Sequence, residues 1–320
     1  MQLVAIVNSF NRRELLMRAV TALVRALDPS GVAYGIVVFE AGSTDGSREW
    51  LCQFAAEHPQ LRLETILAAQ TEDTSFAEGV NRACRHALQT FPEAEFLFLY
   101  ETDNWIAGAE PITRAMQVLR DQPRLAALGF TVRLHSGTPC GWGTPFPTVL
   151  SFVLGQHLSG YLGIPKPRTP TAESRSRSWF PADVVYTSPL MIKAAVWREL
   201  GGMDSSRFPF SDSDVDWAWK AAKAGYRSGV LVSDAVVHDN GGAMSSWSNM
   251  RVLKFHQARF RLLRRYRGPV TVLAIPALFL RHAVEFGLLA AMVLAGRRPA
   301  LSLRKRLLLM RSVWRGYEFV

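Results

Sequence analysis

Acidic side chains gather at three places in the sequence, where an apolar run ends or a helix begins. Glu40 follows one strand-like run, Glu101 to Asp103 follow another, and Asp212 to Asp216 precede a helix-like segment. His238 closes a further apolar run. Carboxylates at the carboxyl ends of strands suit a hard divalent cation, which usually takes one or two carboxylates together with substrate phosphates. This pattern therefore favours metal-assisted chemistry on a phosphorylated substrate.

Each of these groups also has a purely structural interpretation, which spacing alone leaves open. Glu101 and Asp103 could be solvated residues of a turn. Asp214 and Asp216 could stabilise a helix N-terminus, where the helix dipole favours negative charge. His238 could be a hydrogen-bonded structural histidine.

The elements that must position these groups alternate along the first 110 residues. Continuous apolar runs are typical of strands buried on both faces of a sheet, and they occur at residues 3–7, 35–39 and 96–100. A further strand is predicted at 61–67. Between them, the residue pattern predicts helices at 15–27, 47–57 and 76–90. Such alternation predicts an α/β fold with a doubly wound, mostly parallel sheet, whose ligands bind at the carboxyl ends of the strands.

The second half of the chain is less regular. Residues 135–182 are rich in Gly, Pro, Ser and Thr, and we interpret them as a partly irregular insertion with a mobile loop near 175–178. A predicted helix at 193–200 ends at Gly201-Gly202. A second helix is predicted at 214–224, and the run 229–237 is typical of a strand. The third acidic group therefore lies at the start of a helix.

Taken together, these segments resemble the family 2 glycosyltransferases over about residues 3–250. One matching piece is a weak signal, whereas six pieces in the family's order are specific. The N-terminal pieces are Val4–Arg12 (VAIVNSFNR), Val37–Ser47 (VVFEAGSTDGS), Phe76–Ala83 (FAEGVNRA) and Phe98–Asp103 (FLYETD). The other two are the group formed by Gly201–Asp204, Ser213–Lys220 and Ala224–Arg227, and His238 with Gly241, Gly242 and Ser245. The resemblance implies a GT-A fold, a Rossmann-like, mostly parallel mixed sheet, with a helical C-terminal extension.

The resemblance assigns a nucleotide pocket to the first half of the chain. Glu40 would accept hydrogen bonds from the base or ribose of the nucleotide. The other residues assigned to the donor are Ser9, Asn11, Asp45, Asn81, Glu101, Thr102 and Asp103. The family usually has Asp in place of Glu40, and Glu101-Thr102 replaces the usual first half of the metal motif. Asp103 is therefore the firmer metal ligand.

The catalytic roles follow from the same resemblance. Asp103 would bind the Mg²⁺ or Mn²⁺ that bridges the diphosphate of the donor, and His238 would complete or support that site. Asp214 would be the general base that takes the proton of the acceptor hydroxyl, and direct attack inverts the anomeric configuration. Ser213 replaces the Glu that commonly precedes the base. This change leaves Asp212 and Asp216 as rivals to Asp214.

The acceptor side is less well defined by the sequence. Candidate contacts are Trp142, Tyr186, Asp216 and Trp217. The Gln-x-x-Arg-Trp motif of processive members is absent, because Gln257 to Phe260 has a different spacing and lacks the Trp. We therefore expect transfer of a single sugar, as in rhamnosyltransferase-like, non-processive members.

Positive charge is concentrated near the C-terminus. The chain has 37 Lys and Arg against 27 Asp and Glu, a net charge of +10. Residues 1–250 hold 22 Lys and Arg against 25 acidic residues, and residues 251–320 hold 15 against 2. We therefore predict a catalytic domain at 1–250, with a nucleotide-binding half at 1–110 and an acceptor-side half at 111–250, followed by a basic tail at 251–320.

The basic tail alternates cationic and apolar segments. Its longest uncharged runs, 268–280 and 286–296, are shorter than the roughly 18–20 residues that cross a bilayer. We therefore expect helices that lie in the interface of an anionic membrane. Nucleic-acid binding would use the charge but leaves the apolar stretch unexplained. Packing of the tail on the catalytic body or on another subunit is a third interpretation.

A hydrophobic fraction of 48% excludes a disordered chain. Cys52, Cys84 and Cys140 form no paired pattern, and the chain starts with a strand-like run rather than a signal peptide, so we expect a cytoplasmic protein on the inner face of the cell membrane. The expected function is inverting, metal-dependent transfer of one sugar from a UDP or dTDP donor to a lipid-linked saccharide in bacterial surface polysaccharide synthesis. The alternatives are a sugar-phosphate nucleotidyltransferase, which the turn Asn8–Asn11 disfavours, and an inactive relative that binds membrane or nucleic acid.

Overall fold

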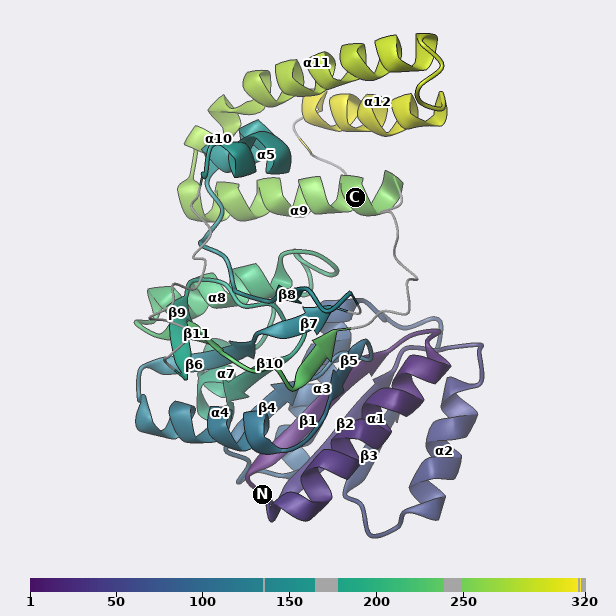
Figure 1. Ribbon diagram of the computed structural model, residues 1–320, viewed down its shortest axis with the longest axis vertical. Helices are drawn as coiled ribbons and strands as arrows, with labels where there is room; N and C mark the ends of the chain where they lie inside the picture. The colour runs from purple at the N-terminus through teal and green to yellow at the C-terminus, as the bar shows by residue number, and fades with distance from the viewer. Residues whose placement is uncertain (135, 165–177, 239–248, 316, 318–320) are drawn as a thin grey trace. The chain divides into compact units, whose positions relative to one another are not determined.

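The computed structural model describes residues 1–134, 136–164, 178–238, 249–315 and 317. Their contacts divide the chain into two compact units, and Figure 1 labels most of their helices and strands. The sheet unit comprises Met1–Thr144, Arg168–Pro209 and Ser213–Ala243, and the helical unit comprises Pro145–Pro167, Phe210–Asp212 and Met244–Val320. The sequence analysis placed 145–167 and 210–212 in the catalytic domain, whereas their contacts lie with the C-terminal helices. Composition cannot reveal this grouping, because these segments are distant from the tail along the chain.

An eight-stranded sheet forms the centre of the sheet unit. Among the described residues its order is β3-β2-β1-β4-β10-β6-β11-β9, with β10 and β9 antiparallel to their neighbours. The strands are β1 (Leu3–Ser9), β2 (Tyr34–Glu40), β3 (Leu63–Leu67), β4 (Phe96–Leu99), β6 (Leu125–Phe130), β9 (Trp179–Ala182), β10 (Leu190–Lys193) and β11 (Arg227–Leu231). The strands predicted in the first 110 residues are present and parallel. The register places Ser9 beside Glu40, so these two predicted site residues share one edge of the sheet.

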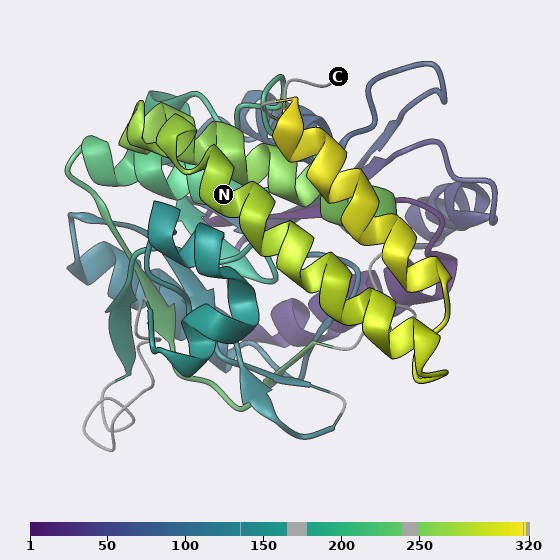
Figure 2. The same cartoon turned by 90° about the horizontal axis from the view of Figure 1, so that it is seen from above.

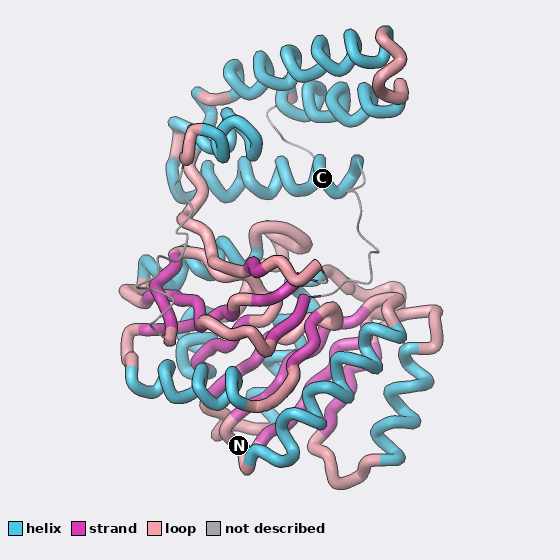
Figure 3. The backbone as a smooth tube through the Cα atoms, viewed as in Figure 1, coloured by secondary structure: helices cyan, strands magenta, loops and turns pink. Residues whose placement is uncertain are grey.

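Helices cover both faces of this sheet (Figure 3). One buried apolar cluster lies under α1 (Arg13–Leu27), α2 (Ser47–Glu57) and α4 (Glu110–Asp121), and a 3₁₀ turn at Asp28–Ser30 follows α1. The opposite cluster lies under α3 (Phe76–Thr90), α7 (Ala194–Leu200) and α8 (Ser213–Lys223). The apolar spacing explains this packing, since Leu16, Val20 and Leu23 of α1 all face the sheet and are buried. The predicted helices are thus confirmed, with α7 ending at Gly201 in the left-handed conformation.

A second sheet, of order β5-β12-β7-β8, contributes to the same edge. Its strands are β5 (Asn104–Ile106), β12 (Val236–His238), β7 (Val132–Leu134) and β8 (Pro139–Cys140). The single strand predicted at 229–237 is wrong, because β11 ends at Leu231 and β12 belongs to this other sheet. The pairing of β12 with β5 places His238 opposite Asn104, the residue that follows Asp103.

The predicted irregular insertion contains a helix, α5 (Val149–Tyr161), between β8 and β9. Thr148 caps its start through a reciprocal hydrogen-bond pair with Ser151. Gly155, at φ 76°, interrupts the helical backbone. Gly and Ser inside the segment concealed the helix at the level of composition. The predicted mobile loop near 175–178 lies largely outside the described residues.

The helical unit consists of α5 together with α9 (Asn249–Arg267), α10 (Val270–Leu273), α11 (Ile275–Leu294) and α12 (Leu301–Trp314). Figure 2 shows α11 and α12 lying side by side, and α5 contacts both α9 and α11. The uncharged runs considered in the sequence analysis join into one helical segment, because the helix continues through Arg281 and Glu285. Within the described residues, Val270–Leu294 is long and apolar enough to cross a bilayer, with a mean hydropathy of 1.7.

Candidate functional site

The carboxyl ends of β1 and β2 form the first part of the site. The side chain of Glu40 is fully buried and accepts hydrogen bonds from the backbone N–H groups of Gly42, at 3.2 Å, and Ser43, at 2.8 Å. Gly42 has φ 79°, a conformation that favours glycine and lets the loop fold back on the carboxylate. Ser9 Oγ is buried and has no hydrogen-bond partner among the described residues. Glu40 therefore shapes the loop beside Ser9, whose buried hydroxyl has no partner among the described residues.

Asn11 and Asp45 join this loop to the start of α1. The backbone N–H of Asn11 donates to Ser43 Oγ at 2.8 Å, and that of Arg13 donates to Asp45 Oδ2 at 2.8 Å. Ser47 Oγ donates to the other oxygen of Asp45 at 2.6 Å. Burial raises the pKa of Asp45, but these hydrogen bonds outweigh burial, so the pKa lies below its ordinary value. Asn11 and Asp45, both predicted to bind the donor, thus link the loop after β1 to the loop after β2.

Asn81 is placed elsewhere. Its side-chain Nδ2 donates to the Met203 carbonyl at 2.8 Å, and its Oδ1 accepts from the Met203 N–H at 2.9 Å. A Cβ at Gly202 would approach Asn81 Oδ1 to 2.7 Å, so the glycine permits this contact. In the described structure Asn81 fastens α3 to the turn after α7.

The acidic centre lies at the end of β4. Glu101 accepts a hydrogen bond from Thr187 Oγ1. Burial, the negative charge of Asp103 and, to a smaller extent, that of Asp214 raise the pKa of Glu101 to about 7, although Thr187 opposes the shift. Thr102, which lies between Glu101 and Asp103 in the sequence, is buried. Asp103 and, more weakly, Asp214 thus lie close enough to Glu101 to raise the pKa of its carboxyl group.

Asp103 and His238, the predicted metal ligands, are neighbours. His238 Nδ1 lies 3.6 Å from Asp103 Oδ1. Ser188 Oγ lies 3.3 Å from Asp103 Oδ1, 3.3 Å from His238 Nδ1 and 3.0 Å from Asn104 Nδ2. Arg12 Nη1 donates to Asp103 Oδ2 at 3.4 Å. Two possible metal ligands thus lie around Ser188, and the guanidinium of Arg12 partly offsets the negative charge of Asp103.

This donor set fits a substrate-bridging cation better than a closed metal site. Among the described residues, no group of three His, Cys, Asp or Glu side chains could hold a metal ion. Mg²⁺ usually binds one or two protein carboxylates and completes its shell with substrate phosphates and water. Asp103 and His238 supply that number of ligands, and the remaining positions would fall to the donor.

The three aspartates near α8 differ sharply in environment. Asp212, in the helical unit, forms a two-pronged ion pair with Arg259 at 2.7 and 2.8 Å, and its side chain is 3% exposed. Asp216 is completely buried. Asp214 is partly exposed, and its Oδ1 accepts from the Val215 N–H at 2.9 Å. Asp214 is therefore the one of the three that combines solvent access with closeness to the acidic centre.

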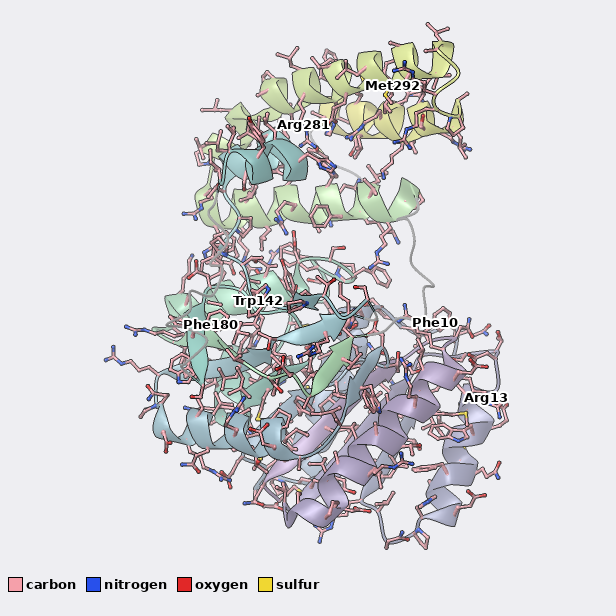
Figure 4. All side chains as sticks on the ribbon, viewed as in Figure 1. Phe10, Arg13, Trp142, Phe180, Arg281 and Met292 are labelled. Atoms are coloured by element: carbon pink, nitrogen blue, oxygen red, sulfur yellow. The ribbon has the colours of Figure 1, made fainter. Side chains whose placement is uncertain are left out.

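The predicted acceptor contacts separate into two groups. Tyr186 is 47% exposed, with its hydroxyl 3.3 Å from Thr144 Oγ1. Trp142 is partly buried against Phe180, and Figure 4 labels both residues in the sheet unit. Trp217 is buried and stacks on Trp197 with ring centroids 5.9 Å apart. Trp217 and the fully buried Asp216 thus lie in the core that supports α8, whereas Tyr186 remains accessible.

Sequence reasoning missed four residues of this centre: Arg12, Asn104, Thr187 and Ser188. Arg12 stood within a recognised motif, and Asn104 directly follows the metal motif, so adjacency could have identified both. Thr187 and Ser188 directly follow Tyr186, but Tyr186 was predicted only as an acceptor contact, and nothing in the sequence linked this loop to an acidic centre more than 80 residues away. Gly241, Gly242 and Ser245 of the His238 motif lie outside the described residues.

Comparisons with known proteins agree with this geometry. Residues 2–268 match the family described as glycosyltransferase-like family 2. A similar solved structure is the mannosyltransferase PcManGT from Pyrobaculum calidifontis in complex with GDP-Man and Mn²⁺, with TM-score 0.57 and 17% identity over 99% of this chain and 87% of that chain. TarS from S. aureus, residues 1–349, has TM-score 0.51 and 16% identity over 99% of this chain and 91% of that chain.

GalNAc-T7 with UDP, GalNAc and Mn²⁺ has TM-score 0.57 and 11% identity, over 82% of this chain and 48% of that chain. A search of curated proteins found no match. At these identities the structural likeness shows the fold, a GT-A-like mixed sheet with C-terminal helices.

Proposed function

Because the chain belongs to glycosyltransferase-like family 2 and is thus a glycosyltransferase that uses a nucleotide sugar, we propose that it transfers one sugar with inversion in a reaction that requires Mg²⁺ or Mn²⁺. The observation that carries the proposal is the grouping of Asp103, His238 and Asp214 at the carboxyl edge of the sheet. PcManGT is described with GDP-Man and Mn²⁺, and GalNAc-T7 with UDP and Mn²⁺, which supports a nucleotide sugar and a metal.

The donor end of the site would hold the diphosphate. Asp103 and His238 would bind Mg²⁺ or Mn²⁺, which when bound neutralises the charge that develops on the departing diphosphate. Ser188 fixes the orientation of both ligands through its contacts at 3.3 Å. Arg12, which pairs with Asp103, adds a further positive charge beside the leaving group. Ser9 and the loop after Glu40 would contact the nucleotide.

Asp214 would act as the general base. Its carboxylate accepts the proton of the acceptor hydroxyl while that oxygen bonds to the anomeric carbon and the bond from this carbon to the diphosphate breaks. Attack from the face opposite the leaving group inverts the anomeric centre. Asp212 is a poor alternative, because its carboxylate already binds Arg259. Asp216 is a poor alternative, because it is completely buried.

The acceptor and the location follow from the C-terminal segment. Residues 251–320 carry 15 Lys and Arg, and the described part exposes large apolar side chains such as Leu273 and Leu294. An enzyme held at an anionic cytoplasmic membrane surface would find lipid-linked saccharides there. A lipid-linked saccharide of a bacterial surface polysaccharide is therefore our proposed acceptor.

The test is a thermal-shift screen of UDP-, dTDP- and GDP-sugars with and without Mn²⁺. A ligand that binds only the folded state stabilises it by about 2.7 kcal/mol at 100 times its Kd. We expect at least one donor to raise the Tm only when Mn²⁺ is present, and Asp103→Asn to abolish the Mn²⁺-dependent part. Asp121→Asn, at the far end of α4, is the matched control. A metal-independent shift that survives Asp103→Asn would refute the metal assignment.

A further inference from the structure

Helix α11 exposes apolar side chains and turns its polar side chains toward the protein, the reverse of an ordinary surface helix. Its most exposed large side chains are all apolar, with Leu280 64%, Val284 54% and Leu288 63% exposed. The spacing of four residues places them in one stripe along the helix, which Met292 extends toward its C-terminal end. Figure 4 labels Met292 on this helix. Water is an unfavourable neighbour for such a continuous apolar face.

The polar residues of α11 face inward instead. His282 is completely buried, and Glu285 interacts with Arg281 Nε at 3.2 Å and with His282 Nδ1 at 3.3 Å. Arg306 of α12 also pairs with Glu285. Burial raises the pKa of Glu285, but the hydrogen bond with His282 and the two guanidiniums overcome this effect and lower it to about 2. The ionic residues in the middle of α11 therefore pair with one another and with α12.

Arg281 ties this ionic cluster to α5. Its Nη1 donates to the carbonyl oxygen of Phe152 at 2.9 Å and to that of Val153 at 3.3 Å. These carbonyls precede Gly155, whose φ of 76° breaks the helical hydrogen bonding. A Cβ at Gly155 would lie 2.2 Å from Arg281 Nη2, so only glycine leaves room for the guanidinium. The helical unit is thus built to keep Arg281 inside and the apolar stripe outside.

Cations and an aromatic side chain accompany the stripe. The turn between α11 and α12 exposes Arg297 and Arg298, and α12 exposes Arg304 and Arg311. Trp314, at the end of α12, is 77% exposed. An apolar surface accompanied by Arg and Trp complements one leaflet of a bilayer, in which hydrocarbon is bordered by anionic headgroups.

The packing of α12 along α11 decides how α11 would meet such a bilayer. If α11 crossed the membrane, α12 would carry the exposed Arg304 and Arg311 into the hydrocarbon with it. A cation at the centre of a bilayer is strongly unfavourable, whereas the same residues at the headgroups are favourable. We propose that the helical unit docks on one leaflet of an anionic membrane, with α11 lying in the membrane plane and its apolar stripe facing the hydrocarbon.

This inference rests on the proposed membrane association but is independent of the proposed sugar transfer. The full-length chain, with Cys84 and Cys140 replaced by Ala, is labelled with an environment-sensitive dye at the exposed Cys52, which serves as the aqueous reference. In further variants Cys52→Ser is combined with Leu273→Cys, Leu288→Cys or Leu294→Cys. Each protein is mixed with phosphatidylglycerol vesicles, and quenching by external iodide is measured before and after lysis.

We expect the labels at 273 and 294 to be protected to the same degree, the label at 288 to be protected most, and lysis to change none of them. A label at one end that iodide reaches only after lysis would show that α11 spans the bilayer and would overturn the inference. Labels that all behave like the one on Cys52 would overturn both the inference and the membrane part of the proposed function.

Two pairs of substitutions test the surface itself by vesicle flotation. Leu280→Gln with Leu288→Gln should weaken binding about 100-fold, whereas Leu134→Gln, on an exposed leucine of the sheet unit, should have no effect. Arg304→Gln and Arg311→Gln should each weaken binding about fivefold on phosphatidylglycerol and not on phosphatidylcholine. If the wild-type chain is a dimer without lipid, and Leu280→Gln with Leu288→Gln makes it monomeric but leaves vesicle binding unchanged, the stripe contacts a second copy of the chain and the inference is wrong.

Discussion

The sheet unit and helix α11 of the helical unit place their ionic groups differently. In the sheet unit, Glu101, Asp103 and Asp214 lie around the carboxyl edge of the sheet, and ion pairs such as Arg120–Glu95 are on the outside. In the helical unit, the ionic side chains of α11 turn inward and its outer stripe is apolar. The sequence shows only that charge rises after residue 250. The structure shows that what differs is the side on which the charge lies.

This contrast indicates that the units suit different surroundings. A unit with ionic groups outside and a carboxylate centre at one edge suits water and a polar substrate. Buried ion pairs contribute little net stability compared with apolar packing, because each ion must lose its hydration. We therefore infer that the ionic side chains of α11 point inward because this leaves the outer face of the helix without charge.

The largest expected effect separates a buried ion pair from an exposed one. Arg259→Met leaves Asp212 buried without its counter-ion, and we expect it to destabilise the helical unit by about 3–5 kcal/mol. Arg120→Met is the matched control, because Arg120 also pairs with a carboxylate and lies over a phenylalanine ring. It should cost about 1 kcal/mol or less. Urea unfolding followed by circular dichroism measures both, and equal losses would contradict the contrast.

A second prediction assigns the metal to the sheet unit. Asp103→Asn removes the carboxylate of the candidate metal site, and we expect sugar transfer at fixed Mn²⁺ to fall about 100-fold. Vesicle flotation should be unchanged, because no residue of the helical unit is altered. A variant with normal transfer and impaired flotation would reverse the roles that we give to the two units.

Acid should weaken the helical unit selectively. Burial, followed by the neighbouring charges of His282, Arg281 and Arg306 and despite Glu285, lowers the pKa of His256 from 6.5 to about 3. Below pH 6.5, His256 therefore binds a proton in the unfolded chain but not in the folded unit. The free energy of unfolding consequently falls as the pH drops from 6.5 toward 3. Glu285, whose pKa is lowered from 4.5 to about 2, adds a further loss below pH 4.5.

Urea midpoints at pH 7.5, 6.0 and 5.0 measure this effect. We expect a progressive decrease for the wild-type chain and a shallower decrease for His256→Leu. Identical slopes for the two proteins would show that the buried histidine is not the source.

The smallest effect concerns Tyr186, the exposed aromatic residue among the predicted acceptor contacts. Tyr186→Phe removes a hydroxyl that lies 3.3 Å from Thr144 Oγ1 on the exposed side of the sheet unit. If Tyr186 only stacks on the acceptor, KM for the acceptor should change less than twofold, whereas Tyr186→Ala should raise it about tenfold with kcat preserved. An unchanged KM in Tyr186→Ala would remove Tyr186 from the acceptor side.

The sheet and its acidic edge could be predicted from the sequence because local patterns determine them. Continuous apolar runs identified β1, β2 and β4, and a parallel sheet brings their carboxyl ends to one edge, so Glu40 and Asp103 were predicted at that edge. The contacts of Ser188 with Asp103, His238 and Asn104 could not be predicted, because only folding brings the Ser188 loop beside β5. The polarity of α11 was also hidden, because its periodicity shows that two faces differ but not which face is covered.

The central claim is that Asp214 carries the chemistry of a nucleotide-sugar transferase in the sheet unit. The most direct measurement is sugar transfer by Asp214→Asn, with donor binding measured in parallel and Asp121→Asn as the control. We predict that kcat falls about 10²–10⁴-fold while Mn²⁺-dependent donor binding is retained, because only the proton acceptor has been removed. Transfer by Asp214→Asn at the wild-type rate would contradict the account.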